Sequence, residues 1–137
     1  MARTHTGSCI CGAVEFRVEE PLRPVIFCHC IQCRKTSGHF VAATNAPWSA
    51  VTLDSQEGLQ WYETSESARR GFCCRCGSSL FWDRHDNEAV SICAGSLDGA
   101  PNLGATHHIH VATKGSYYGH GDTIGDGLPE YNASTPS

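Results

Sequence analysis

The chain has 137 residues, of which 40% are hydrophobic and 18% are charged, and its formal net charge is −4. This length suits one domain with an ordinary core, and the acidic balance disfavours an extended nucleic-acid-binding surface, which needs a basic excess. No apolar run of about 18 residues is present to span a membrane, and the amino-terminal segment has no apolar core of a signal peptide, so a cytoplasmic protein is expected.

Short segments rich in β-branched and aromatic residues follow one another along the chain, each bounded by Gly, Pro, Asn, Asp or Ser, as is typical of strands. The predicted strands are residues 13–18, 24–28, 40–44, 59–63, 79–83, 89–95 and 107–112. Residues 29–38 are predicted to form one helical turn that ends at Gly38. From about Gly115 the chain is rich in glycine and polar residues, which predicts an irregular closing segment with a flexible end. The sequence therefore predicts a small, mostly β domain of short antiparallel strands.

Cysteine is unusually frequent, and most of the thiols fall into a C-x-C, a C-x-C-x-x-C and a C-C-x-C-G. The nine cysteines are Cys9, Cys11, Cys28, Cys30, Cys33, Cys73, Cys74, Cys76 and Cys93. Disulfides between residues two or three positions apart would be strained and would remove little entropy from the unfolded chain. The odd number, the close spacing and the lack of a recognisable export signal favour metal binding over disulfides.

Two cysteine pairs that are distant in the chain make one set of four ligands. On a strand, residues i and i+2 share a face, so the C-x-C can present two sulfurs along one edge of a tetrahedron. A C-x-x-C-G turn can direct its amide N–H groups at the sulfurs, with glycine supplying the permissive dihedral angle. Cys9, Cys11, Cys73 and Cys76 are therefore expected to hold a structural zinc ion. The alternative second pair is Cys74 with Cys76; otherwise Cys74 is a bystander thiol, as Cys93 is expected to be.

The remaining group, Cys28, Cys30 and Cys33, offers three ligands from one short segment and no fourth cysteine at standard spacing. Three protein ligands and an open position are typical of a catalytic zinc, whereas four protein ligands are typical of a structural one. The alternative is that a histidine closes the site. The candidates are His39, His107, His108 and His110. His29 is not among them, because on an extended segment it points away from the face of its neighbours.

The chain resembles one family, the glutathione-dependent formaldehyde-activating enzymes and their relatives of the centromere protein V group. The segments that carry the resemblance are GSCICGAVEF (7–16), FCHCIQCRKTSG (27–38), RRGFCCRCGSSLFW (69–82), AGSLD (94–98), HHIHV (107–111) and GLPEY (127–131). Two departures stand out. Cys74 replaces the proline of the family's C-P-x-C-G knuckle, and GSYYGHG (115–121) stands where the family is usually Trp-rich.

The resemblance implies an Mss4-like fold of small, coiled antiparallel sheets built around a structural zinc. Residues 1–137 would form a single zinc-binding domain, with a core of about 7–131 and a flexible tail over 132–137. By motif position, Cys9, Cys11, Cys73 and Cys76 match the structural zinc ligands, and Cys28, Cys30 and Cys33 match a second, catalytic three-thiolate zinc site. Two zinc ions per chain are thus expected, the second of them labile.

The implied activity is carbon–sulfur bond formation. The chain is expected to be a zinc-dependent carbon–sulfur lyase or synthase, similar to an S-(hydroxymethyl)glutathione synthase, that acts on an adduct of glutathione or a similar thiol with a small aldehyde such as formaldehyde. A nearby histidine could shuttle the proton. The alternative is a non-catalytic zinc module that binds a thiol carrier or a protein. Neither nucleic acid nor membrane is expected as a partner, and the oligomeric state is left open.

Overall fold

The computed structural model describes residues 3–99 and 101–136. Contacts within the chain divide it into two compact units. Unit 1 comprises residues 1–23 and 44–103, and unit 2 comprises residues 24–43 and 104–137. A single zinc-binding domain over residues 1–137 stays a prediction. None of the helices among the described residues is long and apolar enough to cross a lipid bilayer.

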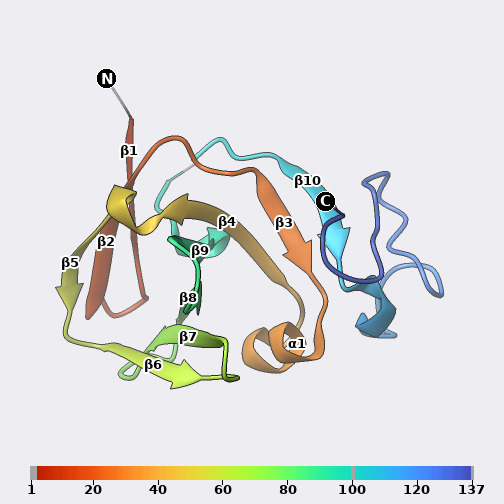
Figure 1. Ribbon diagram of the computed structural model, residues 1–137, viewed down its shortest axis with the longest axis horizontal. Helices are drawn as coiled ribbons and strands as arrows, with labels where there is room; N and C mark the ends of the chain where they lie inside the picture. The colour runs from red at the N-terminus through yellow and green to blue at the C-terminus, as the bar shows by residue number, and fades with distance from the viewer. Residues whose placement is uncertain (1–2, 100, 137) are drawn as a thin grey trace. The chain divides into compact units, whose positions relative to one another are not determined.

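Unit 1 contains two groups of antiparallel strands, which Figure 1 labels along the chain. The first group has the order β1-β2-β5 and consists of β1 (Thr4–Ser8), β2 (Val14–Glu19) and β5 (Val51–Gln56). The second group consists, in spatial order, of β6 (Leu59–Glu63), β7 (Ala68–Cys73), β8 (Ser79–Arg84) and β9 (Ala89–Cys93). Two 3-10 turns, η1 (Trp48–Ala50) and η2 (Ala94–Ser96), also belong to this unit.

The core of unit 1 follows from the strict alternation of β2. Its valines and Phe16 are buried, while the charged residues between them are exposed. The ring of Phe16 packs edge-on against Phe81 of β8, with 5.2 Å between ring centroids. Burying one such aromatic side chain contributes roughly 1.5–3 kcal/mol to folding. Both cysteine-bearing turns of unit 1 end against this core, since Cys9 and Cys73 are buried members of it.

Unit 2 consists of β3 (Val25–Cys28), α1 (Ile31–Ser37), β10 (Ala105–Ile109), the 3-10 turn η3 (Val111–Thr113) and the start of β4 (Val41–Pro47). Residues 41–43 of β4 pair with β3, and residues 44–47 belong to unit 1. Helix α1 ends at Gly38, whose φ of +83° suits glycine and whose N–H donates to the carbonyl of Arg34. The helical turn predicted to end at this residue is therefore confirmed.

One pairing differs from the expected antiparallel arrangement. Strand β10 lies parallel to β3, and the two arrows run side by side in the same direction in Figure 1. A parallel pair needs a long connection between its strands, and here the two strands are separated by residues 29–104. The closing segment follows β10, with the N–H of His108 donating to Pro129 and that of His110 to Ala133.

The mostly β fold class is confirmed, and the seven predicted strands correspond to β2, β3, β4, β6, β8, β9 and β10 within a few residues. Strands β1, β5 and β7 were not predicted. The ends of two predicted strands are instead the 3-10 turns η2 and η3. The strand expected over 107–112 ends before His110, because that residue has a left-handed φ of +55°.

Candidate metal centres

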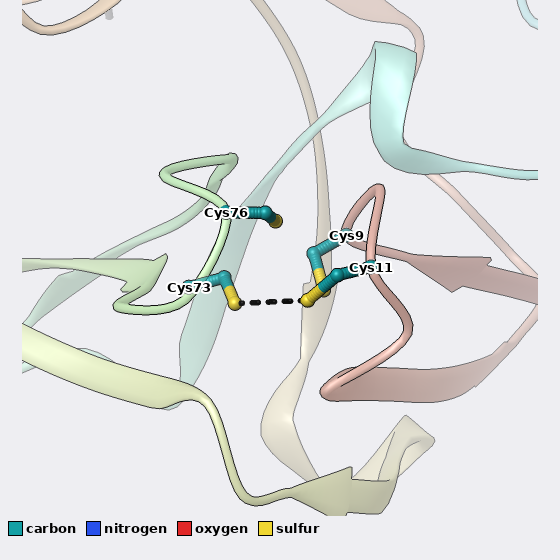
Figure 2. A group of neighbouring side chains, drawn as sticks. All are labelled: Cys9, Cys11, Cys73 and Cys76. Carbon is teal, nitrogen blue, oxygen red and sulfur yellow. Dashed lines mark hydrogen bonds between the residues drawn. The ribbon is translucent and has the colours of Figure 1, made fainter.

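The first cysteine cluster is formed by two turns of unit 1. Cys9 and Cys11 lie in the connection between β1 and β2, and not on a strand as the i, i+2 argument assumed. Cys73 ends β7, and Cys76 lies in the turn before β8. Figure 2 shows the four side chains converging, two from each turn. Their sulfur atoms all lie within 4.8 Å of one another.

The two turns share a design in which a glycine follows the second cysteine. Gly12 follows Cys11 with a φ of +82°, and Gly77 follows Cys76 with a φ of +81°. These left-handed positions favour glycine because it has no Cβ. Each turn also brings a backbone N–H group to sulfur. The N–H of Val14 donates to the sulfur of Cys9 at 3.3 Å, and the N–H of Ser78 donates to the sulfur of Cys76. The N–H groups therefore point at the sulfurs as the C-x-x-C-G argument expects.

The thiols of this cluster differ in acidity. The hydroxyl of Ser78, and then the backbone N–H groups of Cys11 and Ser78, lower the pKa of Cys76 to about 5. The N–H of Ala13 lowers the pKa of Cys11, but burial and the neighbouring sulfurs outweigh it and raise that pKa to about 11. At neutral pH and without a cation, the thiolate of Cys76 thus lies beside the protonated thiol of Cys11. A bound cation favours the thiolate form of every member.

The spacing of the sulfurs fits zinc. A tetrahedral ion with Zn–S bonds of about 2.3 Å places its sulfurs roughly 3.8 Å apart. The sulfur of Cys11 lies 3.7 Å from that of Cys9 and 3.7 Å from that of Cys73. These distances are far longer than a disulfide bond of about 2.05 Å, and none of the nine cysteines forms a disulfide. Cys74 is exposed and is not part of the group.

The second cluster lies in unit 2, where β3 leads into α1. Cys28 is the last residue of β3, Cys30 is the N-cap of the helix, and Cys33 is the buried residue in the helix. The sulfur of Cys30 accepts a hydrogen bond from the backbone N–H of Cys33 at 3.3 Å. All three sulfurs lie within 4.8 Å of one another. The chain between strand and helix therefore brings together the three thiols that the spacing predicted.

Electrostatics resists the ionisation of this cluster without a cation. The sulfurs of Cys30 and Cys33, followed by burial, raise the pKa of the Cys28 thiol above its ordinary value. Three thiolates so close together repel one another, and a divalent cation among them removes that repulsion. Soft sulfur donors at this separation suit zinc. The donor set therefore fits a three-thiolate zinc ion.

The expected fourth ligands are mostly committed to other partners. Among the described residues of unit 2, no histidine or carboxylate places a ligand atom within 4.8 Å of all three sulfurs. Both ring nitrogens of His107 bond to threonine hydroxyls, and Nδ1 of His39 lies 2.7 Å from the hydroxyl of Tyr117. Both ring nitrogens of His108 are also engaged. Within unit 2 the cluster is thus a three-sulfur site.

A buried chain of hydrogen bonds runs beside the second cluster and was not predicted. Nδ1 of His29 lies 2.6 Å from the hydroxyl of Tyr118, and its Nε2 lies 2.8 Å from Nδ1 of His108. Nε2 of His108 in turn lies 2.7 Å from the carboxylate of Asp126. Both imidazoles are fully buried, at 0% and 1% exposure. The only sequence signal for this chain was the placement of His29 on the face opposite its cysteine neighbours.

The protonation of this chain follows from its surroundings. Burial, followed by the charges of neighbouring groups, lowers the pKa of His29 to about 4, so its imidazole is neutral at neutral pH. The hydrogen bond from His108 lowers the pKa of Asp126 below its ordinary value, so the carboxylate is ionised and can only accept. The carboxylate therefore accepts from Nε2 of His108, and the neutral imidazole of His29 has one ring nitrogen that donates and one that accepts.

Unit 2 also contains a cavity of about 390 Å³. Its walls are formed by η3, by the closing segment and by Lys114, whose ammonium also lies over the ring of Tyr118. Pockets of roughly 300–1,000 Å³ accommodate small-molecule ligands. The cavity is therefore large enough for a compact peptide-sized molecule.

Comparison with known proteins places the chain among its relatives. Residues 4–113 match the family model described as glutathione-dependent formaldehyde-activating enzyme. A putative glutathione-dependent formaldehyde-activating enzyme of Halomonas elongata is 38% identical over 102 residues, covering 67% of this chain and 64% of that protein. An uncharacterized lyase of Schizosaccharomyces pombe is 32% identical over 83 residues, covering 57% and 56%. The chain thus spans about three fifths of the length of these relatives.

A solved structure agrees with this placement. The crystal structure of a Rhodobacter sphaeroides protein has a TM-score of 0.60 and 30% sequence identity, and the match covers 71% of this chain and 91% of that one. The family model spans the strands and both cysteine clusters described above. The chain therefore belongs to the glutathione-dependent formaldehyde-activating enzyme family.

Proposed function

We propose that this protein is a zinc-dependent carbon–sulfur lyase or synthase that joins a thiol such as glutathione to a small aldehyde such as formaldehyde. The observation that carries the proposal is the three-sulfur cluster of Cys28, Cys30 and Cys33, which the described residues of unit 2 provide with no fourth cysteine, histidine or carboxylate ligand, in a chain of this family. An open coordination position is what distinguishes catalytic from structural zinc. In the same proposal, Cys9, Cys11, Cys73 and Cys76 hold the structural zinc ion.

The reaction needs no oxidant or reductant. A bond forms between the thiol sulfur and the carbonyl carbon, the C–O π bond breaks, and one proton moves from sulfur to oxygen. A bound zinc ion supplies a positive charge that favours the thiolate or polarises the carbonyl. Cys28, Cys30 and Cys33 would hold that ion as thiolates. Because thiol addition to formaldehyde is already easy, positioning and charge stabilisation are the main contributions to be expected from the protein.

The cavity of unit 2 supports a thiol carrier as the ligand. It lies in the same unit as the three-sulfur cluster, and its wall carries the ammonium of Lys114 and the carboxylate of Asp122. Glutathione carries two carboxylates and one ammonium group, which these two charges attract. This part of the proposal concerns the class of substrate: a small anionic thiol.

The test measures exchange between ¹³C-formaldehyde hydrate and its glutathione adduct by magnetisation-exchange NMR. Zinc-loaded wild-type protein should raise the exchange rate above the protein-free rate. Cys30→Ser should return it to the protein-free rate while leaving the circular dichroism spectrum unchanged. The matched control, Cys74→Ser, removes an exposed thiol outside both clusters and should keep the full rate. Exchange with wild-type protein no faster than without it would reject the enzyme and leave a zinc-binding module.

A further inference from the structure

His29 lies between two of the three cysteines, and every hydrogen-bonding group it has is used. Its backbone N–H donates to the carbonyl of Ile109 at 3.0 Å, and its carbonyl accepts from the hydroxyl of Thr113 at 3.1 Å. Its two ring nitrogens are bonded to Tyr118 and His108. Four bonds from one buried residue hold the centre of the 28–30 segment in place.

The side-chain bonds of His29 continue outward in one direction. The imidazole of His108 is also buried, and its Nε2 is hydrogen-bonded to the carboxylate of Asp126, which is 39% exposed. Aromatic rings flank the two imidazoles: Phe40 lies 4.6 Å from His29 and Phe27 lies 4.9 Å from His108, between ring centroids. The hydrogen bonds and ring contacts thus fix the orientation of both imidazoles, from Tyr118 at one end to Asp126 at the other.

Burying two neighbouring imidazoles costs free energy, because their polar nitrogen atoms lose contact with water. A pair of apolar side chains would pack in the same aromatic surroundings without the cost of burying polar groups. What imidazoles add is direction, because each hydrogen bond fixes the ring about its own axis. In an extended segment the side chains alternate between faces. Fixing the ring of His29 on one face therefore fixes where the thiols of Cys28 and Cys30 point on the other.

We propose that His29, held through His108 by Asp126, is a positioning residue of the three-cysteine site and preorganises Cys28 and Cys30 for one metal ion. None of these three residues contacts the metal; they act through the backbone that carries the thiols. The inference rests on the proposed function only in that it needs the cluster to bind a metal. Supports of this kind typically change metal affinity by 10–100-fold when they are removed.

The experiment follows zinc transfer from the zinc-loaded, full-length protein to a chromophoric chelator. Two phases are expected, and Cys30→Ser identifies the faster phase by abolishing it. Asp126→Ala should speed the faster phase by about tenfold or more, while the slower phase of the four-cysteine cluster keeps its rate. The slower phase is an internal control, because it reports on a site of unit 1 in the same molecule.

Three further variants sharpen the result. Asp126→Asn keeps an oxygen that accepts from His108, so it should restore the wild-type rate to within about threefold. Tyr118→Phe removes only the hydroxyl that is hydrogen-bonded to Nδ1 of His29, and it should also speed the faster phase. Asp122→Ala, which removes a nearby carboxylate of the closing segment, should leave both phases unchanged.

The possible failures are distinguishable. A wild-type protein with one zinc per chain and a single phase would overturn both the metal site and this inference. Two phases in wild type with no change in Asp126→Ala would overturn the inference and leave the proposed function standing. Equal acceleration of both phases would show a general loss of stability and would also overturn it.

Discussion

At the scale of single residues, Cys74 and Cys76 show how position decides the role of a thiol. Cys76 is half-buried, and its sulfur lies 3.3 Å from the hydroxyl of Ser78, which helps to lower its pKa. Cys74 is exposed and lies outside the four-sulfur group. We therefore expect Cys76→Ser to remove one zinc per chain and to lower the melting temperature sharply. Elemental analysis and thermal unfolding measure both effects.

The matched variant, Cys74→Ser, should keep the zinc content and change the free energy of unfolding by no more than about 0.5 kcal/mol. Loss of zinc from Cys74→Ser with retention in Cys76→Ser would reverse the assignment. It would make Cys74 the ligand that the knuckle provides.

Tyr118 makes the stability of the protein depend on pH in the alkaline range. Burial raises the pKa of its phenol above the ordinary value of 10.0, and in the folded protein its hydroxyl lies 2.6 Å from Nδ1 of His29. A group with a raised folded pKa contributes its stability below the unfolded value and loses it as the pH rises through the folded value. The free energy of unfolding should therefore fall above about pH 10, at up to roughly 1.4 kcal/mol per pH unit from this group.

Ultraviolet absorbance of tyrosinate measures this titration. The zinc-loaded protein should show one tyrosine that ionises later than the others, and Tyr118→Phe should abolish that late component. A late component that persists in Tyr118→Phe would assign it to another tyrosine.

At the scale of elements, the two cysteine turns depend on the β5–β6 connection. Gly58 is buried there; its N–H donates to Ala13 and its carbonyl accepts from Cys74. A Cβ at this position would lie 2.7 Å from the sulfur of Cys73 and 2.8 Å from the Cβ of Ala13. Gly58→Ala should therefore displace Cys73, cost about 1–3 kcal/mol of stability and weaken the first zinc site.

Urea unfolding and zinc release together test the role of Gly58. Gly95→Ala is the matched control, because a Cβ there meets nothing within 4 Å and its φ is not left-handed. A Gly58→Ala protein as stable as Gly95→Ala would show that the turns tolerate the methyl group.

Strand β7 escaped prediction for a physical reason. It begins with Ala68 and contains Gly71, and both residue types are depleted in strands. In the folded chain the guanidinium of Arg69 lies 3.8 Å from the ring centroid of Trp61, and its Nε donates to the buried Asp83. A Cβ on Gly71 would lie 2.9 Å from Trp61, so the site needs glycine. These reasons are tertiary contacts, which a single segment of sequence does not contain.

At the scale of the whole molecule, the difference between local sequence and tertiary contacts also decides which parts of the candidate site could be predicted. Each cysteine motif could be predicted from its local spacing, and the two distant motifs of the first cluster could be combined because a structural zinc needs four ligands. The chain through His29, His108, Tyr118 and Asp126 could not, because it joins residues up to 97 positions apart through the fold. Its members are also ordinary residue types that carry no metal-like spacing.

Metal removal should follow the division between the two clusters. Four sulfurs from two turns separated by more than 60 residues hold the first site, whereas three sulfurs from one segment hold the second. Fewer ligands and an open position make the second ion easier for a chelator to capture. Limited chelation of the zinc-loaded protein should therefore remove one zinc per chain, and hydrogen exchange should then quicken around residues 28–37 while β2 and β8 stay protected. Complete removal should expose those strands as well, because the first ion contributes folding free energy to unit 1. Loss of both ions in one step, with protection lost everywhere at once, would contradict separate sites with separate roles.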